Sequence, residues 1–170
     1  IGEVRGELEP CGCPTLPYGG FVRRDRLLQE QKQQSTVFHL DAGELLLKGF
    51  YSNKGDDAKK RARLLSSLSK NVGVDAWSIG PTDIMALGIQ ELISIEGPSR
   101  ISANLVDSHG DWLFEPYIIL QKNNIKIAVI GLTEIPTDPQ WALQVTTIPP
   151  EQALQKVLPM IPKVSHDLRL

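Results

Sequence analysis

Apolar residues recur along the chain at two alternating spacings, one typical of amphipathic helices and one typical of buried strands. The clearest helical pattern lies in residues 56–71, where Ala62, Leu65 and Leu68 form an apolar stripe. Asp56 stands in the first turn of this segment and complements the helix dipole. Three further helices are predicted: one that Gly19-Gly20 opens, one that Thr82 or Asp83 caps and that Gly97-Pro98 ends, and one from Pro150 to about Met160.

Runs of apolar and β-branched residues between these helices predict strands. Asn123-Asn124 separates two of the runs and predicts a hairpin turn. Because helices and strands alternate along most of the chain, their order indicates an α/β sandwich with a largely parallel sheet. The predicted strands are residues 1–9, 36–40, 74–79, 100–105, 117–121 and 125–132.

The composition of the 170 residues suits one globular domain. A formal net charge of −2, with 41% hydrophobic and 22% charged residues, excludes a disordered chain and a strongly basic nucleic-acid binder. No apolar run approaches the roughly 18 residues that a membrane helix needs. The chain starts at Ile1 rather than Met and stops where an apolar strand begins at Leu168, so we expect a piece of a longer protein.

Both cysteines lie in one loop rich in proline and glycine, in the sequence Cys11-Gly12-Cys13. This is not the CxxC spacing of zinc ribbons or thioredoxin-like proteins, and two thiols alone cannot complete a tetrahedral zinc site. Three interpretations stay open: a structural staple, a redox-active pair, or ligands of a soft metal together with other residues.

Polar side chains gather where the predicted strands end. In open α/β sheets, ligands bind beyond the carboxyl ends of the strands. Carboxylates that meet there beside a cysteine pair suit a cation site or acid–base chemistry. The residues at these ends are Glu3 and Arg5 for the first strand, Asp41 and Glu44 for the second, Thr82 and Asp83 for the third, and Asn104 for the fourth.

A series of short motifs runs in a fixed order through residues 1–134. The motifs are Gly6, Gly19-Gly20-Phe21-Val22-Arg23, Asp41-Ala42-Gly43-Glu44, Gly80-Pro81-Thr82-Asp83, Ala103-Asn104, Pro116-Tyr117 and Gly131-Leu132. Their order and spacing resemble the N-terminal part of the calcineurin-like metallophosphoesterases, in the branch that contains bacterial 5′-nucleotidases and UDP-sugar hydrolases. The Cys-Gly-Cys-Pro sequence resembles a subgroup of bacterial exported proteins that are often lipid-anchored.

The resemblance implies a metallophosphoesterase-like α/β/β/α sandwich with a mostly parallel mixed sheet. Residues 1–170 would form a single partial domain, the first half to two thirds of that sandwich, with its C-terminal part missing. Residues 1–134 match best, and residues 135–170 form a Pro-rich connection and a helix that lead to the missing part. The implied parent activity is hydrolysis of nucleotide or nucleotide-sugar phosphoesters in the periplasm or outside the cell, and a lipid anchor upstream stays open.

Most metal-ligand positions of that family carry other residues here. By resemblance, Glu3 and Arg5 stand for the Asp and His of the family's first strand. Glu44 stands for the Asp after the second strand, and Pro81 for the Asn after the third. Glu3 and Glu44 keep oxygen ligands for a hard cation, but the guanidinium of Arg5 has no lone pair to offer. Thr82 replaces the general-acid histidine and cannot donate a proton usefully at neutral pH. We therefore expect the standard two-metal site to be lost.

Three functions stay open: a diverged 5′-nucleotidase-like protein that acts on small-molecule phosphoesters, a thiol-based redox or metal-binding module, and a non-catalytic scaffold for a protein partner. The implied cofactor is a divalent metal, namely zinc, manganese or iron, or no metal at all. The metal candidates are Glu3, Glu44 and Asp83, with Cys11 and Cys13 as a thiol alternative, and the cleft candidates are Arg5, Asp41, Thr82 and Asn104.

Several residues also have purely structural interpretations. Arg5 can pair with an acidic neighbour and fill the cleft. The Asp41 side chain can cap a turn. His39 lies within an apolar run and is expected to be a core histidine with satisfied hydrogen bonds. Trp77 is expected to pack in the core rather than to stack on a ligand.

Overall fold

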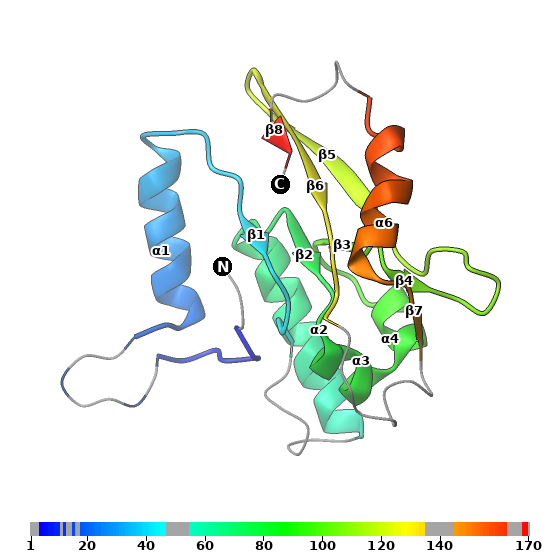
Figure 1. The fold of residues 1–170 in the computed structure, drawn as a ribbon. Coiled ribbons are helices and arrows are strands. Elements are labelled where there is room, and N and C mark those ends of the chain that lie inside the picture. The colour runs from blue at the N-terminus through cyan, green and yellow to red at the C-terminus, as the bar shows by residue number, and fades with distance from the viewer. Residues whose placement is uncertain are drawn as a thin grey trace.

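The computed structural model describes residues 4–10, 12, 15, 18–46, 55–134, 145–162 and 168–169. Strands and helices alternate through most of this length, as the sequence predicts (Figure 1). The helices are α1 (Phe21–Lys32), α2 (Asp56–Asn71), α3 (Pro81–Leu87), α4 (Ile89–Ser94), α6 (Pro150–Val157) and the short 3₁₀ helix η1 (Leu158–Met160). The strands are β1 (Leu40–Asp41), β2 (Ala76–Ser78), β3 (Ser99–Ile101), β4 (Leu105–Val106), β5 (Tyr117–Lys122), β6 (Ile125–Ile130), β7 (Thr146–Thr147) and β8 (Leu168–Arg169).

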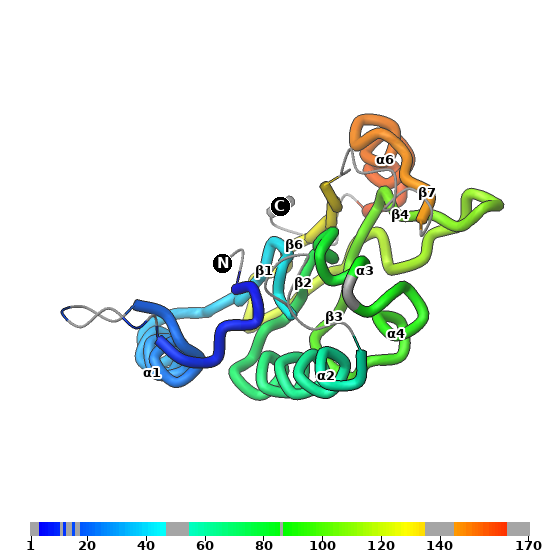
Figure 2. Tube along the Cα trace, turned by 90° about the horizontal axis from the view of Figure 1, so that it is seen from below, coloured from blue at the N-terminus to red at the C-terminus, as the bar shows by residue number. Residues whose placement is uncertain are grey.

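Strands β1, β2 and β3 form a parallel sheet in that order. Asp41 pairs with Trp77, and Trp77 in turn with Arg100, so the three strands end at one edge of the sheet. Figure 2 shows α2 and α6 on opposite sides of the strands. The predicted α/β class with a parallel sheet is therefore confirmed.

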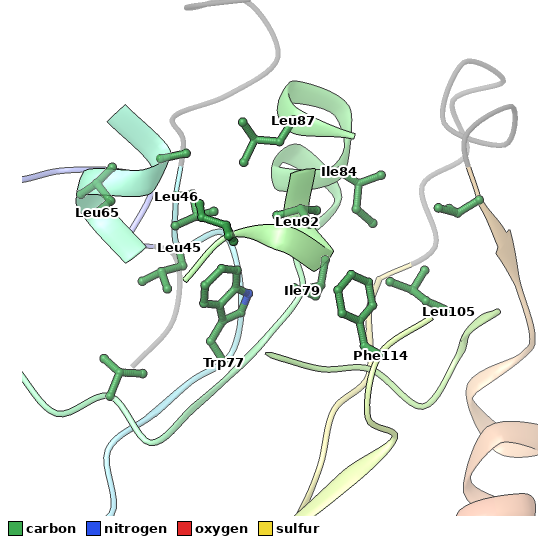
Figure 3. Packing of buried hydrophobic residues seen from close by; sticks show 14 of the residues in the cluster. Leu45, Leu46, Leu65, Trp77, Ile79, Ile84, Leu87, Leu92, Leu105 and Phe114 are labelled. Carbon is green, nitrogen blue, oxygen red and sulfur yellow. The ribbon is translucent and has the colours of Figure 1, made fainter. Parts of the chain in front are cut away.

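The larger core lies between this sheet and helices α2, α3 and α4 (Figure 3). Trp77, Leu65 and Leu92 are fully buried in it, and Ala62 lies beside them. The apolar stripe predicted for residues 56–71 therefore faces the core. Burying one Leu side chain in this way stabilises the fold by about 1.5–3 kcal/mol.

The hairpin predicted around Asn123-Asn124 is present as β5 and β6, with Lys122 paired to Ile125. Asn123 adopts a left-handed φ of 52°, which asparagine tolerates better than most residues. β8 extends the same sheet, in parallel with β6. The short antiparallel pair of β4 and β7 was not predicted.

One predicted helix differs from the structure in two respects. The helix expected to end at Gly97-Pro98 is two helices, α3 and α4, because Gly88 between them has a φ of 76° that interrupts the helical backbone. The helix begins at Pro81 rather than after a Thr82 or Asp83 cap, and its N-cap is Gly80.

The strand predicted for residues 1–9 is wrong for residues 4–9, which form no strand; residues 1–3 lie outside the described part. Arg5 and Gly6 have φ values of 50° and 68°, so the chain turns there instead of extending. The turned segment lies against the loop after β1, because the backbone N–H of Gly6 donates to the carbonyl of Leu45 at 3.1 Å.

Candidate functional site

The loops after β1 and β2 meet at the carboxyl edge of the sheet, as expected from the parallel strands. Two glycines allow this approach. A Cβ on Gly43 would lie 3.1 Å from the carbonyl oxygen of Ser78, and a Cβ on Gly80 would lie 2.5 Å from the backbone nitrogen of Glu44. Side chains at these positions would separate the two loops, so the sequence brings Asp41, Glu44 and the start of α3 together through its glycines.

Asp83 fastens the two loops to each other. Its side chain is fully buried and accepts hydrogen bonds from the backbone N–H of Leu46 at 3.0 Å and of Gly80 at 3.4 Å. Burial is the largest influence and raises the pKa of Asp83 to about 7; the hydrogen bond from Leu46 opposes the rise and the Glu44 carboxylate adds to it. The carboxyl group therefore forms hydrogen bonds with the backbone of both loops and is shielded from solvent.

Glu44 makes a second connection across the same junction. Its Oε1 accepts a hydrogen bond from the backbone N–H of Thr82 at 3.2 Å, and its backbone carbonyl accepts one from the N–H of Arg5. Glu44 itself has a φ of 56°, a left-handed conformation that is uncommon outside glycine. The geometry brings together Arg5, Glu44, Thr82 and Asp83, four of the residues that the sequence singled out.

Asn104 joins two segments of the chain through buried hydrogen bonds. Its Nδ2 donates to the carbonyl of Thr133 and its Oδ1 accepts from the N–H of Thr133, both at 2.8 Å. The hydroxyl of Ser102 also donates to Oδ1, at 3.2 Å. All three side chains are buried, so Asn104 joins the segment after β3 to the segment after β6.

Asp41 is buried at the end of β1 and is only partly satisfied. Its Oδ1 accepts a hydrogen bond from the N–H of Gly43 at 3.1 Å, which is the turn-capping contact anticipated from the sequence. Its Oδ2 is buried without a hydrogen-bond partner in the described part of the chain. Burial raises the pKa of Asp41, and the hydrogen bond from Gly43 opposes that rise. Asp41 also lines a cavity of about 320 Å³, together with apolar side chains of Leu40, Ala76 and Val129.

The two metal candidates that the structure describes, Glu44 and Asp83, accept hydrogen bonds from backbone N–H groups. The carboxylate of Asp83 is turned to backbone N–H groups inside the fold, and one oxygen of Glu44 accepts from Thr82. Arg5 is exposed and cannot ligate a cation. Over the described ranges, no group of three or more His, Cys, Asp or Glu side chains is arranged to hold a metal ion. Glu3, Cys11 and Cys13 lie outside these ranges.

Two buried polar side chains differ from what the sequence indicates. His39 is buried as expected, but neither ring nitrogen has a hydrogen-bond partner in the described structure, so the expectation of a satisfied histidine is wrong. Arg24, in α1, has two buried nitrogens, Nε and Nη2, that also have no hydrogen-bond partner among the described residues. The available signal was the two-residue spacing of His39 and Asp41, which places both on one side of an extended segment.

No helix within the described ranges is both long and apolar enough to cross a membrane.

Known proteins resemble this chain in structure rather than in sequence. No protein-family model and no curated protein matches the sequence. The calcineurin-like phosphoesterase YfkN from Bacillus subtilis superposes with a TM-score of 0.76 at 15% identity, over 99% of this chain and 58% of that one. A 5′-nucleotidase precursor from Thermus thermophilus superposes with a TM-score of 0.68 at 20% identity, over 94% of this chain and 33% of that one. The NAD nucleotidase of Haemophilus influenzae superposes with a TM-score of 0.70 at 18% identity, over 94% of this chain and 30% of that one.

The chain spans between 30% and 58% of the length of these three structures. Each of them superposes on at least 94% of this chain. The chain has the fold of the calcineurin-like phosphoesterases and 5′-nucleotidases, of which it makes up one part.

Proposed function

We propose that residues 1–170 are part of a diverged 5′-nucleotidase-like domain whose standard two-metal site has been lost. The observation that carries this proposal is the position of Asp83, which is buried and accepts hydrogen bonds from the backbone of both loops of the candidate cleft. A carboxylate in that position holds the loops in place without a cation. The solved 5′-nucleotidases support a location outside the cytoplasm and a small phosphoester as the ancestral substrate.

The chemistry of the cleft supports the same conclusion. Two-metal hydrolysis needs cations that lower the pKa of a water molecule and clamp the charge of the phosphoryl group. Arg5 brings a fixed positive charge to the cleft but no lone pair. The Thr82 hydroxyl stays protonated at neutral pH and is a poor general acid. Phosphoester hydrolysis through the standard two-metal route is therefore not expected.

Metal content is the most direct test. Protein purified without a His-tag, loaded with Mn²⁺ or Zn²⁺ and then desalted, is expected to keep well below one equivalent of metal by plasma mass spectrometry. Hydrolysis of AMP is expected to stay at the level of a heat-denatured control. One or more equivalents of metal, with AMP hydrolysis that a chelator abolishes, would contradict the proposal.

Two matched variants identify the source of any metal that is found. Cys11→Ser combined with Cys13→Ser removes the thiols and leaves the carboxylates. Glu44→Gln removes the negative charge of the Glu44 side chain and keeps its shape. Metal lost only in the cysteine variant would assign binding to the thiols and support a thiol module instead, whereas metal lost only in Glu44→Gln would assign it to the cleft.

A further inference from the structure

A cavity of about 320 Å³ lies between the sheet of β1, β2 and β3 and the sheet of β5, β6 and β8. One wall comes from the first of these sheets and includes Leu40 and Ala76. The other wall comes from β6 and the residues after it, and includes Val129 and Leu132. Among the described residues, none of β5 or β8 borders the cavity, so it lies beside the part of the second sheet that those strands cover.

The cavity offers few polar side chains to an occupant. Ser78 borders it, but its hydroxyl already donates to the carbonyl of Leu132 at 2.9 Å. Asp41 borders it as well, yet Asp41 pairs with Trp77 on the neighbouring strand, and paired residues direct their side chains to the same face of a sheet. The Trp77 ring lies in the core beside α2, α3 and α4 (Figure 3), which places the Asp41 carboxylate on the face away from the cavity.

The cavity continues an interface that the protein already has. Next to it, Ala76 and Ile101 of the first sheet pack against Ile127 and Val129 of β6, and all four side chains are buried. Partly buried side chains of β5 pack against the same cluster. The two sheets are therefore in face-to-face contact where β5 and β6 lie, whereas Ala42, at the border of the cavity, is exposed.

The backbone of β6 indicates which group would extend this interface. The N–H of Gly131 donates to the carbonyl of Pro116 at 3.4 Å, so the residues of β6 in phase with Gly131 direct their backbone groups toward β5. Ile130 is out of phase and directs its N–H and C=O to the opposite side of β6. On that side lies β8, which runs parallel to β6 with Arg169 opposite Ala128 (Figure 1).

We propose that the cavity holds a β-strand in line with β8, from a part of the phosphoesterase fold that this chain does not include. The strand pairs with β6 between Val129 and Leu132, because the direction and register of β8 lead there. Every second side chain of the strand points into the cavity, against Leu40 and Ala76. The partner is therefore an extended segment with apolar, β-branched residues at alternate positions.

A designed tail tests the proposal. Thr-Val-Thr-Val added after Leu170 carries valine at the positions that face the first sheet when the register of β8 continues. We expect amide hydrogen exchange of Ile130 and Leu132, measured by NMR on the 170-residue chain with and without the tail, to slow about tenfold, the factor that one added hydrogen bond supplies. The tail Thr-Pro-Thr-Pro is the matched control, because proline has no N–H to donate to β6.

Ala42→Glu separates binding in the cavity from other effects of the tail. Ala42 is exposed, so the change is tolerated in the chain without a tail, but it places a charge beside the valines of the tail. We expect it to abolish the slowing of exchange. Ser67→Glu is the matched control, because Ser67 is also exposed and lies on α2, on the other side of the first sheet, and it should leave the slowing unchanged (Figure 2).

Three results would overturn the proposal. They are equal exchange rates with the two tails, a slowing that survives Ala42→Glu as fully as Ser67→Glu, and a slowing that grows with protein concentration, which would assign the cavity to a second copy of the chain. The proposal concerns the packing of the two sheets and not the metal centre, so metal content and AMP hydrolysis test the proposed function separately.

Discussion

A Cβ placed on Gly80 would lie 2.5 Å from the backbone nitrogen of Glu44, closer than real Cβ atoms come to any such atom. The loops after β1 and β2 can therefore meet only with glycine at this position. We expect Gly80→Ala to lower the free energy of unfolding by about 1–3 kcal/mol, the usual cost of inserting a methyl group into a packed site. Urea denaturation measures this. Gly12→Ala is the control, because its Cβ would meet nothing within 4 Å, and equal effects of both changes would argue against the close loop contact.

Asp83 makes stability depend on pH in a defined direction. Its pKa rises from 3.8 to about 7 in the folded state, so its contribution is fully present below pH 3.8 and declines as the pH rises toward 7. Asp83→Asn removes this contribution. The free energy of unfolding of the variant, relative to that of the unchanged protein, is expected to increase between pH 4 and 7, by up to about 1.4 kcal/mol per pH unit. If urea denaturation gives the same difference in the free energy of unfolding between the two proteins at every pH in this range, Asp83 does not titrate there.

His39 is expected to act in the opposite direction. Burial lowers its pKa from 6.5 to about 4, so the folded state holds it neutral while the unfolded chain takes up a proton. Stability is therefore lost as the pH falls from 6.5 to 4. His39→Phe removes the titration and keeps a ring of similar size, and its stability relative to the unchanged protein is expected to rise toward acid pH. A difference in the free energy of unfolding between His39→Phe and the unchanged protein that stays constant with pH would contradict the assignment.

Lys122 and Asp75 connect the β5–β6 hairpin to the start of β2. The Nζ of Lys122 lies 2.6 Å from Oδ2 of Asp75 and donates also to the carbonyl of Val37 at 2.7 Å. Since both side chains are largely shielded from water, we expect a coupling energy of about 1.5–3 kcal/mol in a double-mutant cycle of Lys122→Met and Asp75→Asn. The exposed pair of Lys60 and Asp57, at 3.7 Å, is the comparison and should show no measurable coupling. Similar values for both pairs would rule out a special role for the partly buried one.

Leu65 and Leu64 provide a matched pair in α2. Leu65 is fully buried in the larger core, whereas Leu64 is 50% exposed on the same helix. Leu65→Ala is expected to cost about 2–5 kcal/mol, because it removes buried surface and leaves a cavity. Leu64→Ala should cost far less in the same urea experiment. A larger loss at Leu64 would mean that the buried face of α2 is assigned wrongly.

The sequence predicts elements with strong periodicity well, and α2 is the clearest case because Ala62 and Leu65 repeat at helical spacing. It also predicts that Asp41, Glu44 and Asp83 approach one another, since parallel strands end at one edge. The sequence cannot show that the side chains of Asp83 and Asn104 form hydrogen bonds with backbone groups, because those groups belong to segments far apart in the chain. The strand expected at residues 4–9 fails for a local reason, the left-handed conformations of Arg5 and Gly6.

The unmet hydrogen bonds of His39 have the same origin. A histidine in an apolar run is usually buried with its nitrogens paired, and the local pattern gives no information about which polar groups of distant segments lie near the ring. The tertiary arrangement therefore decides whether the ring nitrogens of such a histidine find partners.

The backbone contacts of Asp83 and Asn104 have a consequence for how this edge of the sheet can change over evolutionary time. Both side chains hold their loops through protein atoms alone, so the shape of the edge does not depend on what occupies it. Exposed positions around them can then change at little cost in folding, whereas Asp83 and Asn104 are under constraint whatever the activity. Among related chains, we expect these two residues to persist while the positions around them diversify, which would make them markers of the architecture rather than of a reaction.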